Sequence, residues 1–335
     1  MDINFIKNLR SPYYNSGLEK IIYKKKRNRI IDGILICKKS NRWFKIEDTI
    51  LDLTKIDKHN YDDYLNFKKK YKVNFALKTD FDEIEFIDQQ KEFFNKNTTR
   101  YEKEIIDSPF SKIIDRVLLK NFVENYKSNK IKNILNIGGG SGREALVMAK
   151  NNLNVSIVDV SVEILKLAKK KLIKSNCFKN VNLICNYAEK LNIKDNTFDG
   201  FIIYGAAHHF NNPSTGFLEA LRVTKPNGMF FIWEPSITIL RRVFDLSMKI
   251  FQIWKEEDNI KIIFNKNYFL KLLKKHSTKL KITNFILIPP HIYYVVPKFL
   301  HYCIIKFDLI LSNFLFLKNL GGTLVVSGYK KSINK

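Results

Sequence analysis

The stretch that decides the fold is ILNIGGGSG, residues 134–142, in which an apolar run leads directly into four glycines and a serine. Glycine is costly to order, so such a cluster indicates that the bare backbone approaches something closely. An apolar strand, a glycine turn and a following helix are typical of sites for phosphates, dinucleotides and other nucleoside cofactors. Four glycines in five positions disfavour a tight turn without a ligand.

The spacing of the glycines separates these alternatives. Gly138, Gly140 and Gly142 form G-x-G-x-G, whereas a dinucleotide fingerprint would place its third glycine at the position of Arg143. The chain contains no G-x-x-x-x-G-K-[ST] run. Asp159 lies 21 residues after Gly138 at the end of the next strand, where a carboxylate can accept both ribose hydroxyls. The alternative for Asp159 is a helix N-cap, but its spacing from the glycines favours ribose binding.

From Ile131 onward, strand patterns alternate with amphipathic helix patterns. Strands are predicted at 134–138, 155–159, 181–185, 201–204, 229–233 and 323–329, and helices at 143–151, 162–175 and 214–224. This alternation predicts a parallel, doubly wound α/β sheet.

Four runs then carry a specific resemblance. ILNIGGGSGREALVMA, VDVSVEILKLAKKK, NYAEKLNIKDNTFDGFIIYGAAHHF and EALRVTKPNGMFFIWEP resemble class I S-adenosylmethionine-dependent methyltransferases, especially the small-molecule branch typified by ubiquinone/menaquinone-biosynthesis enzymes. The resemblance covers about residues 131–235. It implies a Rossmann-like sheet of seven strands whose last strand is antiparallel, with S-adenosylmethionine as cofactor across the carboxyl ends of the first four strands.

The resemblance also implies roles for individual residues. The implied cofactor residues are Gly138, Gly140 and Gly142 around the methionine and ribose, Asp159 on the ribose hydroxyls, Val160 on the adenine, Ala188 and Glu189 at the adenine edge, and Tyr204 and Gly205 near the methyl group. His208 and His209 follow the fourth strand, where the acceptor should approach, and a histidine there can remove the acceptor's proton. His209 is the favoured catalytic residue; the competing interpretation is that either histidine caps the adjoining turn.

Two positions depart from the family pattern. Asn136 stands where the family usually has Asp or Glu, and Tyr187 stands where an acidic residue commonly receives the adenine amino group. Losing a charged hydrogen bond at either position would cost about 1–2 kcal/mol of binding. These departures motivate one alternative function, a catalytically silent scaffold with the methyltransferase fold.

The residues before the glycine turn predict two further regions. Residues 1–55 alternate as in a small β module, residues 56–128 form a linker and a helical lid, and residues 129–335 form the methyltransferase domain with an acceptor-pocket insertion at 236–320. In the lid, Phe94 and Tyr101 are expected to face the cofactor or the acceptor pocket.

LRSPYYNSGLEK and IIDGILICKKSNRWFKIEDTILDL resemble the zinc-ribbon module that accompanies many methyltransferases. The four ligand positions of that module hold Ser11, Tyr14, Cys37 and Ser40 here, and one thiolate cannot hold a tetrahedral zinc ion. We therefore predict a degenerate module without a metal.

The charge of the chain points to anionic partners without choosing among them. The net charge is +25, but only 10 of the 58 basic residues are Arg. Recognition of nucleic-acid phosphates would favour more Arg, so the excess of Lys is better explained by a bias toward A/T-rich codons. An RNA methyltransferase is the alternative enzyme; it is not favoured, because YGAAHH replaces an N-P-P-Y-type motif after the fourth strand.

The run KFLHYCIIKFDLILSNFLFLK, residues 298–318, is apolar nearly all round and predicts either core packing or a membrane-interface helix. It favours a small or lipid-linked acceptor and contact with an anionic membrane.

The chain shows neither a signal-peptide pattern nor a run of about 18 uncharged apolar residues. Its four scattered cysteines fit a reducing compartment. We expect a cytoplasmic protein at the periphery of the inner membrane face; the oligomeric state stays open.

Overall fold

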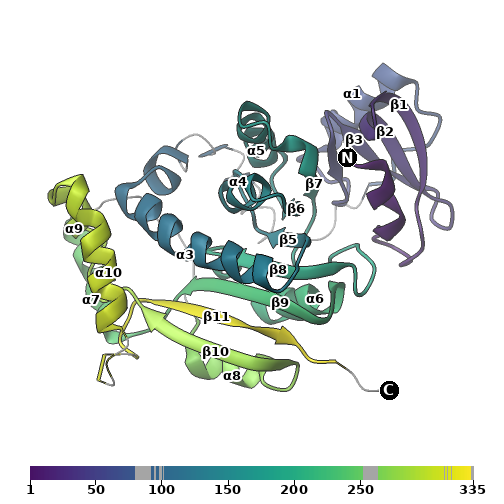
Figure 1. Cartoon of the computed structure of the whole chain (residues 1–335). Coiled ribbons are helices and arrows are strands. Elements are labelled where there is room, and N and C mark those ends of the chain that lie inside the picture. Colours follow the sequence, from purple (N-terminus) through teal and green to yellow (C-terminus); the bar gives the residue numbers. More distant parts are fainter. Residues whose placement is uncertain are drawn as a thin grey trace.

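The computed structural model describes residues 1–79, 92–93, 96–97, 100, 102–251, 263–312, 314, 316–317 and 319–332 (Figure 1). Their strands form one sheet in the order β1-β2-β3-β4-β7-β6-β5-β8-β9-β11-β10. The strands are β1 (Glu19–Lys26), β2 (Arg29–Cys37), β3 (Arg42–Glu47), β4 (Ile50–Asp52), β5 (Asn133–Ile137), β6 (Asn154–Asp159), β7 (Val181–Cys185), β8 (Phe198–Tyr204), β9 (Thr224–Pro235), β10 (Ser277–Phe285) and β11 (Thr323–Lys330).

The seven strands from β7 to β10 confirm the predicted Rossmann-like sheet. β7, β6, β5, β8 and β9 run parallel to one another, and β11 lies antiparallel between β9 and β10. The predicted strands and helices of residues 134–235 are all present. β10 and α8 fall within the predicted insertion 236–320, so part of that segment belongs to the sheet and its covering layer.

The N-terminal β module extends the same sheet. β4 pairs in parallel with β7, Leu51 opposite Ile184, and β3, β2 and β1 follow as antiparallel strands. Figure 1 shows this module beyond the β7 edge of the seven-stranded sheet, whereas α7, α9 and α10 lie at the left, near the carboxyl ends of β9 and β10. The long helices are α1 (Tyr61–Tyr71), α3 (Pro109–Ser128), α4 (Arg143–Lys150), α5 (Val162–Lys174), α6 (Pro213–Val223), α7 (Ile239–Ile250), α8 (Lys266–Leu273) and α10 (His301–Leu311).

Short helical segments complete the description. They are η1 (Ile3–Asn8), η2 (Glu102–Ile106), η3 (Phe178–Asn180), η4 (Ala207–His209), α9 (Ile292–Val295) and η5 (Lys298–Leu300). The apolar run 298–318 is therefore a short 3₁₀ turn followed by α10, which ends at Leu311, rather than one long helix. None of the described helices is long and apolar enough to cross a bilayer.

The sheet is covered on both faces, which explains its nearly continuous apolar strands. One core contains buried residues of α3, α4, α5, α9 and α10, and the other contains those of η1, α6 and α8. Ile134, Leu135 and Ile137 of β5 are completely buried between them. β5 is thus a rigid base for the glycine turn that follows it.

The structure brings together three of the four positions that the zinc-ribbon resemblance would assign as ligands, Ser11, Cys37 and Ser40. Burial raises the pKa of the Cys37 thiol, but hydrogen bonds from Ser11, Ser40 and Ser16 outweigh it and lower the pKa to about 7. Tyr14 is exposed. The described residues contain no group of three or more His, Cys, Asp and Glu side chains arranged to hold a metal ion.

Candidate active site

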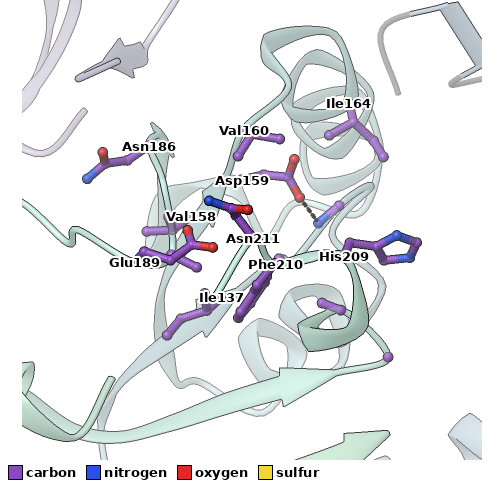
Figure 2. A pocket seen from close by; sticks show the side chains of 15 residues that line it. Ile137, Val158, Asp159, Val160, Ile164, Asn186, Glu189, His209, Phe210 and Asn211 are labelled. Carbon is purple, nitrogen blue, oxygen red and sulfur yellow. Dashed lines mark hydrogen bonds between the residues drawn. The ribbon is translucent and has the colours of Figure 1, made fainter. Parts of the chain in front are cut away.

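A pocket opens where the carboxyl ends of β5, β6, β7 and β8 meet (Figure 2). The space between its lining residues is about 670 Å³, a volume that includes open solvent. Its lining residues are Ile137, Gly138, Gly140, Val158, Asp159, Val160, Ile164, Asn186, Ala188, Glu189, Gly205, Ala206, His209, Phe210 and Asn211.

The glycine turn forms one wall of the pocket through its backbone. Gly138 has φ +62°, and a Cβ added there would lie 2.4 Å from the Cβ of Ala206. Its N–H donates to the Val158 carbonyl at 2.8 Å, which ties the exit of β5 to β6. Only glycine therefore allows the turn to approach the exit of β8 this closely.

Asp159 connects the end of β6 to the glycine turn. Its carboxylate accepts hydrogen bonds from the N–H of Gly140 at 2.9 Å and from the N–H of Ser161 at 3.1 Å. Burial raises the pKa of Asp159, while these backbone donors act in the opposite direction. Figure 2 shows Asn186 and Glu189 on one side of Asp159 and His209 on the other. The carboxylate occupies the middle of the pocket wall.

Asn186 brings a buried amide to the same pocket. Its Oδ1 accepts from the N–H of Tyr187 at 2.9 Å and from Nδ2 of Asn192 at 3.1 Å. Its Nδ2 is buried and has no hydrogen-bond partner among the described residues. A buried donor without a partner is costly, and this nitrogen is also closed off from the pocket, because it has almost no accessible surface.

The opposite wall depends on a buried carboxylate at the end of β9. Glu234 is completely buried, and its Oε1 accepts from the N–H groups of Ala206 and Ala207 at 2.9 and 2.6 Å. Its Oε2 lies 2.7 Å from Nδ1 of His208. The ring of His208 lies 4.1 Å from that of His209, measured between centroids. Glu234 therefore fixes the loop that carries both histidines.

A second polar cluster lies beneath the glycine turn. Asn136 is completely buried, and its Nδ2 donates to Glu144 at 3.4 Å. Arg143 reaches Glu144 at 2.8 Å and Asp115 at 3.4 Å. Asp115 also accepts from the Tyr204 hydroxyl at 3.0 Å. The carboxylate of Glu144 thus places negative charge beside Asn136, the position where the sequence lacks it.

The structure brings eight of the predicted site residues to the pocket: Gly138, Gly140, Asp159, Val160, Ala188, Glu189, Gly205 and His209. Four others lie behind it for identifiable reasons. Gly142 caps α4, where a Cβ would lie 3.0 Å from that of Ala168. Asn136 and Tyr204 belong to the buried cluster, and His208 faces Glu234. Phe94 and Tyr101 lie outside the described residues.

Sequence reasoning missed Asn186, Ile164, Phe210, Asn211 and Glu234. Asn186 and Phe210 are the first and last residues of the run 186–210, which carries part of the family resemblance. Asn186 directly follows β7, and Phe210 directly follows the two histidines. Tyr187, the predicted departure at the adenine, is not among the lining residues, and Asn186 lines the pocket beside it. Glu234 gave only one signal, a charged residue at the end of an otherwise apolar strand.

The strand order, the glycine turn and the carboxylate after β6 together define a class of protein. Residues 135–232 match the family described as "Methyltransferase domain". This part of the chain is a class I S-adenosylmethionine-dependent methyltransferase domain.

Among curated proteins the chain is similar to ubiquinone/menaquinone biosynthesis C-methyltransferases. That of Rickettsia bellii is 29% identical over 160 residues, which cover 42% of this chain and 64% of the relative. That of Rickettsia typhi is 31% identical over the same length and coverage. That of Rickettsia prowazekii is 32% identical over 149 residues, or 39% of this chain and 60% of the relative. The chain thus spans less than two thirds of the length of these relatives.

Solved structures give more distant similarities. A methyltransferase from Thermotoga maritima covers 72% of this chain and 99% of its own at 17% identity, with a TM-score of 0.47. The Haemonchus contortus phosphoethanolamine N-methyltransferase 2 in complex with S-adenosylmethionine covers 75% of this chain and 61% of its own at 16% identity, also with a TM-score of 0.47. The fold assignment rests on the strand order described above.

The residues of the pocket fit S-adenosylmethionine, the cofactor of this class. The turn at Gly138 leaves backbone where a Cβ would collide, and the carboxylate of Asp159 can accept from hydroxyl groups. Val160, Ile164 and Phe210 supply apolar surface for a base.

Proposed function

We propose that the chain transfers a methyl group from S-adenosylmethionine to a small or lipid-linked acceptor by in-line displacement. The observation that carries this proposal is the pocket itself, in which the glycine turn and Asp159 face a wall that holds His209. A cofactor site and a candidate proton acceptor therefore share one cavity. A scaffold protein would not need this second wall.

When bound, the cofactor supplies a methyl group on a positively charged sulfur. The chain's own contribution is positioning, which supplies most of the rate in such a transfer. We assign the ribose to Asp159 and the adenine to the surface of Val160 and Ile164. Backbone N–H groups of the glycine turn are assigned to the polar end of the cofactor.

His209 is the residue we assign to the acceptor's proton. It lines the pocket, and its ring packs beside His208. The Oε1 atom of Glu234 already accepts two backbone hydrogen bonds, so its Oε2 is suited to accept from Nδ1 of His208. This bond fixes the ring of His208, against which His209 packs. Glu234 and His208 are thus positioning residues, and His209 is the proposed catalytic residue.

The names of the relatives support a lipid-linked acceptor. These relatives are C-methyltransferases of ubiquinone and menaquinone biosynthesis, and the match covers the cofactor-binding part of this chain. The segment after β9, which follows the pocket wall, carries many exposed apolar side chains. An acceptor with an apolar tail is consistent with both observations.

Transfer of labelled methyl groups would test this function. The full chain is incubated with S-adenosylmethionine labelled on its methyl group, together with either a total bacterial lipid extract or total RNA. We expect label in the lipid fraction and loss of that label in Asp159→Ala. Label in RNA alone would contradict the lipid-linked acceptor, and cofactor binding without transfer to any acceptor class would favour the scaffold.

A further inference from the structure

The helix after β9 presents its apolar stripe to solvent. In α7, Ile239, Val243, Leu246 and Ile250 recur at helical spacing, and each is more than half exposed. Phe244 is the buried residue of this helix. A surface helix of a globular protein normally buries such a stripe against the core. In α7 the stripe is available to a partner.

Helix α10 is oriented in the same unusual way. Its buried residues are His301, Ile305 and Asp308, while Phe307 and Ile310 are more than half exposed. Asp308 is completely buried, and its carboxylate accepts from the N–H groups of Leu287 and Ile288 at 2.9 and 3.0 Å. These bonds hold the charged side chain inward. They thereby fix the aromatic face of α10 outward.

The two helices belong to one surface. The ring of Phe244 in α7 lies 5.4 Å from that of His291, which precedes α9, and His291 Nε2 lies 2.7 Å from the Phe251 carbonyl. Tyr293 of α9 contacts His301 of α10 at 5.3 Å between ring centroids. Figure 1 shows α7, α9 and α10 side by side beyond the sheet.

We call this surface the apolar face and define it by its exposed side chains. They are Ile239, Val243, Leu246, Ile250, Phe251, Tyr294, Val295, Phe299, Leu300, Tyr302, Phe307, Ile310, Phe314 and Phe316. Phe299 and Phe316 are 78% and 92% exposed. A cluster of this size marks an interaction site rather than scattered surface residues.

The charges around the apolar face indicate what it meets. Among the described residues of α7, α9, η5 and α10, the exposed charged ones are Arg242, Lys249, Lys298 and Lys306, all positive. Of the acids on the same elements, Asp245 is paired with Arg241 at 2.6 Å and Asp308 is buried. Lipid phosphates would neutralise these cations. A second copy docked face to face would instead bring them together.

We propose that the apolar face docks on an anionic lipid surface, with its aromatic side chains at the level of the headgroups and its cations on the phosphates. Aromatic and aliphatic side chains beside Lys and Arg are the composition of interfacial helices. β9 and β10 both run toward the end of the sheet that carries the pocket and lead into these helices, so docking would bring a membrane to that end. The proposal does not depend on methyl transfer, because docking is measured without cofactor.

Vesicle sedimentation tests the proposal. The full chain is spun with vesicles of phosphatidylcholine alone or of equal parts phosphatidylcholine and phosphatidylglycerol, at about 0.1 M and about 0.5 M salt. We expect binding to the anionic vesicles that weakens at the higher salt. The variant Leu246→Ser/Phe299→Ser should lower the partition coefficient by at least about tenfold. The variant Lys298→Glu/Lys306→Glu should lower it by about tenfold or more on anionic vesicles.

Matched controls separate docking from a general loss of apolar surface. Ile173 on α5 and Leu218 on α6 are also exposed, at 50% and 40%, and lie outside the apolar face. Ile173→Ser/Leu218→Ser should bind vesicles like the unaltered chain, and circular dichroism should show all variants folded. The proposal is overturned if the unaltered chain does not bind, or if the control variant loses as much binding. It is also overturned if light scattering shows a dimer that Leu246→Ser/Phe299→Ser abolishes.

Discussion

The two walls of the pocket are built in different ways. The wall at β5 and β6 comes from one contiguous stretch, in which the glycine turn and Asp159 are joined by backbone hydrogen bonds. The wall at β8 comes from a loop that Glu234 holds from 26 to 28 residues away. The comparison teaches that local backbone chemistry shapes the wall proposed for the cofactor, whereas one buried carboxylate shapes the wall proposed for the acceptor.

Gly138→Ala should have the largest effect on cofactor binding. The added Cβ would lie 2.4 Å from the Cβ of Ala206, and φ is +62° at this residue. The turn would have to move, and we expect affinity for S-adenosylmethionine to fall by about 100-fold or more, measured by equilibrium dialysis. The matched control is Gly17→Ala, where nothing lies within 4 Å of the added Cβ and φ is not in the left-handed region. Equal affinity in both variants would break the account of the turn.

Glu234→Gln should act on the other wall. The amide can still accept from the N–H groups of Ala206 and Ala207, but its nitrogen cannot accept from Nδ1 of His208. We expect kcat to fall by about 10- to 100-fold, while the Kd for S-adenosylmethionine changes by less than about threefold. Steady-state kinetics with dialysis would measure both quantities. An equal loss in Kd and kcat would show that the two walls are not separable.

Asn136→Asp tests whether Glu144 already supplies the charge that the strand position lacks. A second carboxylate 3.4 Å from Glu144 in a buried site would be repelled. We expect cofactor affinity to fall by about three- to tenfold and the free energy of unfolding to fall by about 1–3 kcal/mol. The double variant Asn136→Asp/Glu144→Gln should recover most of both. Tighter binding in the single variant would instead mean that Asn136 is a weakening departure.

Asp115 should have no direct effect on cofactor binding, and its effect should appear as a pH dependence of stability. Burial raises the pKa of Asp115 from 3.8 to about 6, with Arg143 acting against it. Because the folded pKa is the higher one, its favourable contribution is complete below 3.8 and is lost as the pH rises through about 6. Relative to Asp115→Asn, the unaltered chain should lose about 1–3 kcal/mol of unfolding free energy over this interval. Urea unfolding at several pH values measures the difference, and parallel curves would contradict it.

The sequence predicted the part of the fold that depends on local patterns. Between Ile134 and Pro235, the glycine turn and the alternation of strand and helix periods are both local, and the structure confirms the elements and the sheet. The pairing of β4 with β7 was not predictable, because a strand of three residues, of which only Ile50 and Leu51 are apolar, does not specify a partner strand. The sequence also did not predict that α10 turns Asp308 inward and its aromatic side chains outward. A charged residue such as Asp308 is expected to face solvent unless its hydrogen-bond donors, here the N–H groups of Leu287 and Ile288, are known.

The candidate site shows the same division. The glycines and Asp159 carry a sequence signal because their spacing is fixed by a single turn. Glu144 reads as an ordinary acid in the first turn of a helix, and only the fold places it beside Asn136. Glu234 reads as the end of a strand, and its hydrogen bonds reach back to a loop that precedes α6. Interactions of this kind depend on which strands become neighbours.

The most direct test of the account is titration calorimetry of the full chain with S-adenosylmethionine, beside Asp159→Ala and the control Asp195→Ala. Asp195 is a surface carboxylate paired with Arg222 at 2.6 Å and lies outside the pocket. We predict binding in the micromolar range for the unaltered chain and for Asp195→Ala, and an affinity lower by about 10- to 100-fold in Asp159→Ala. No heat at high micromolar cofactor, or equal affinity in all three proteins, would contradict the central claim that the pocket at the ends of β5 to β8 is the cofactor site.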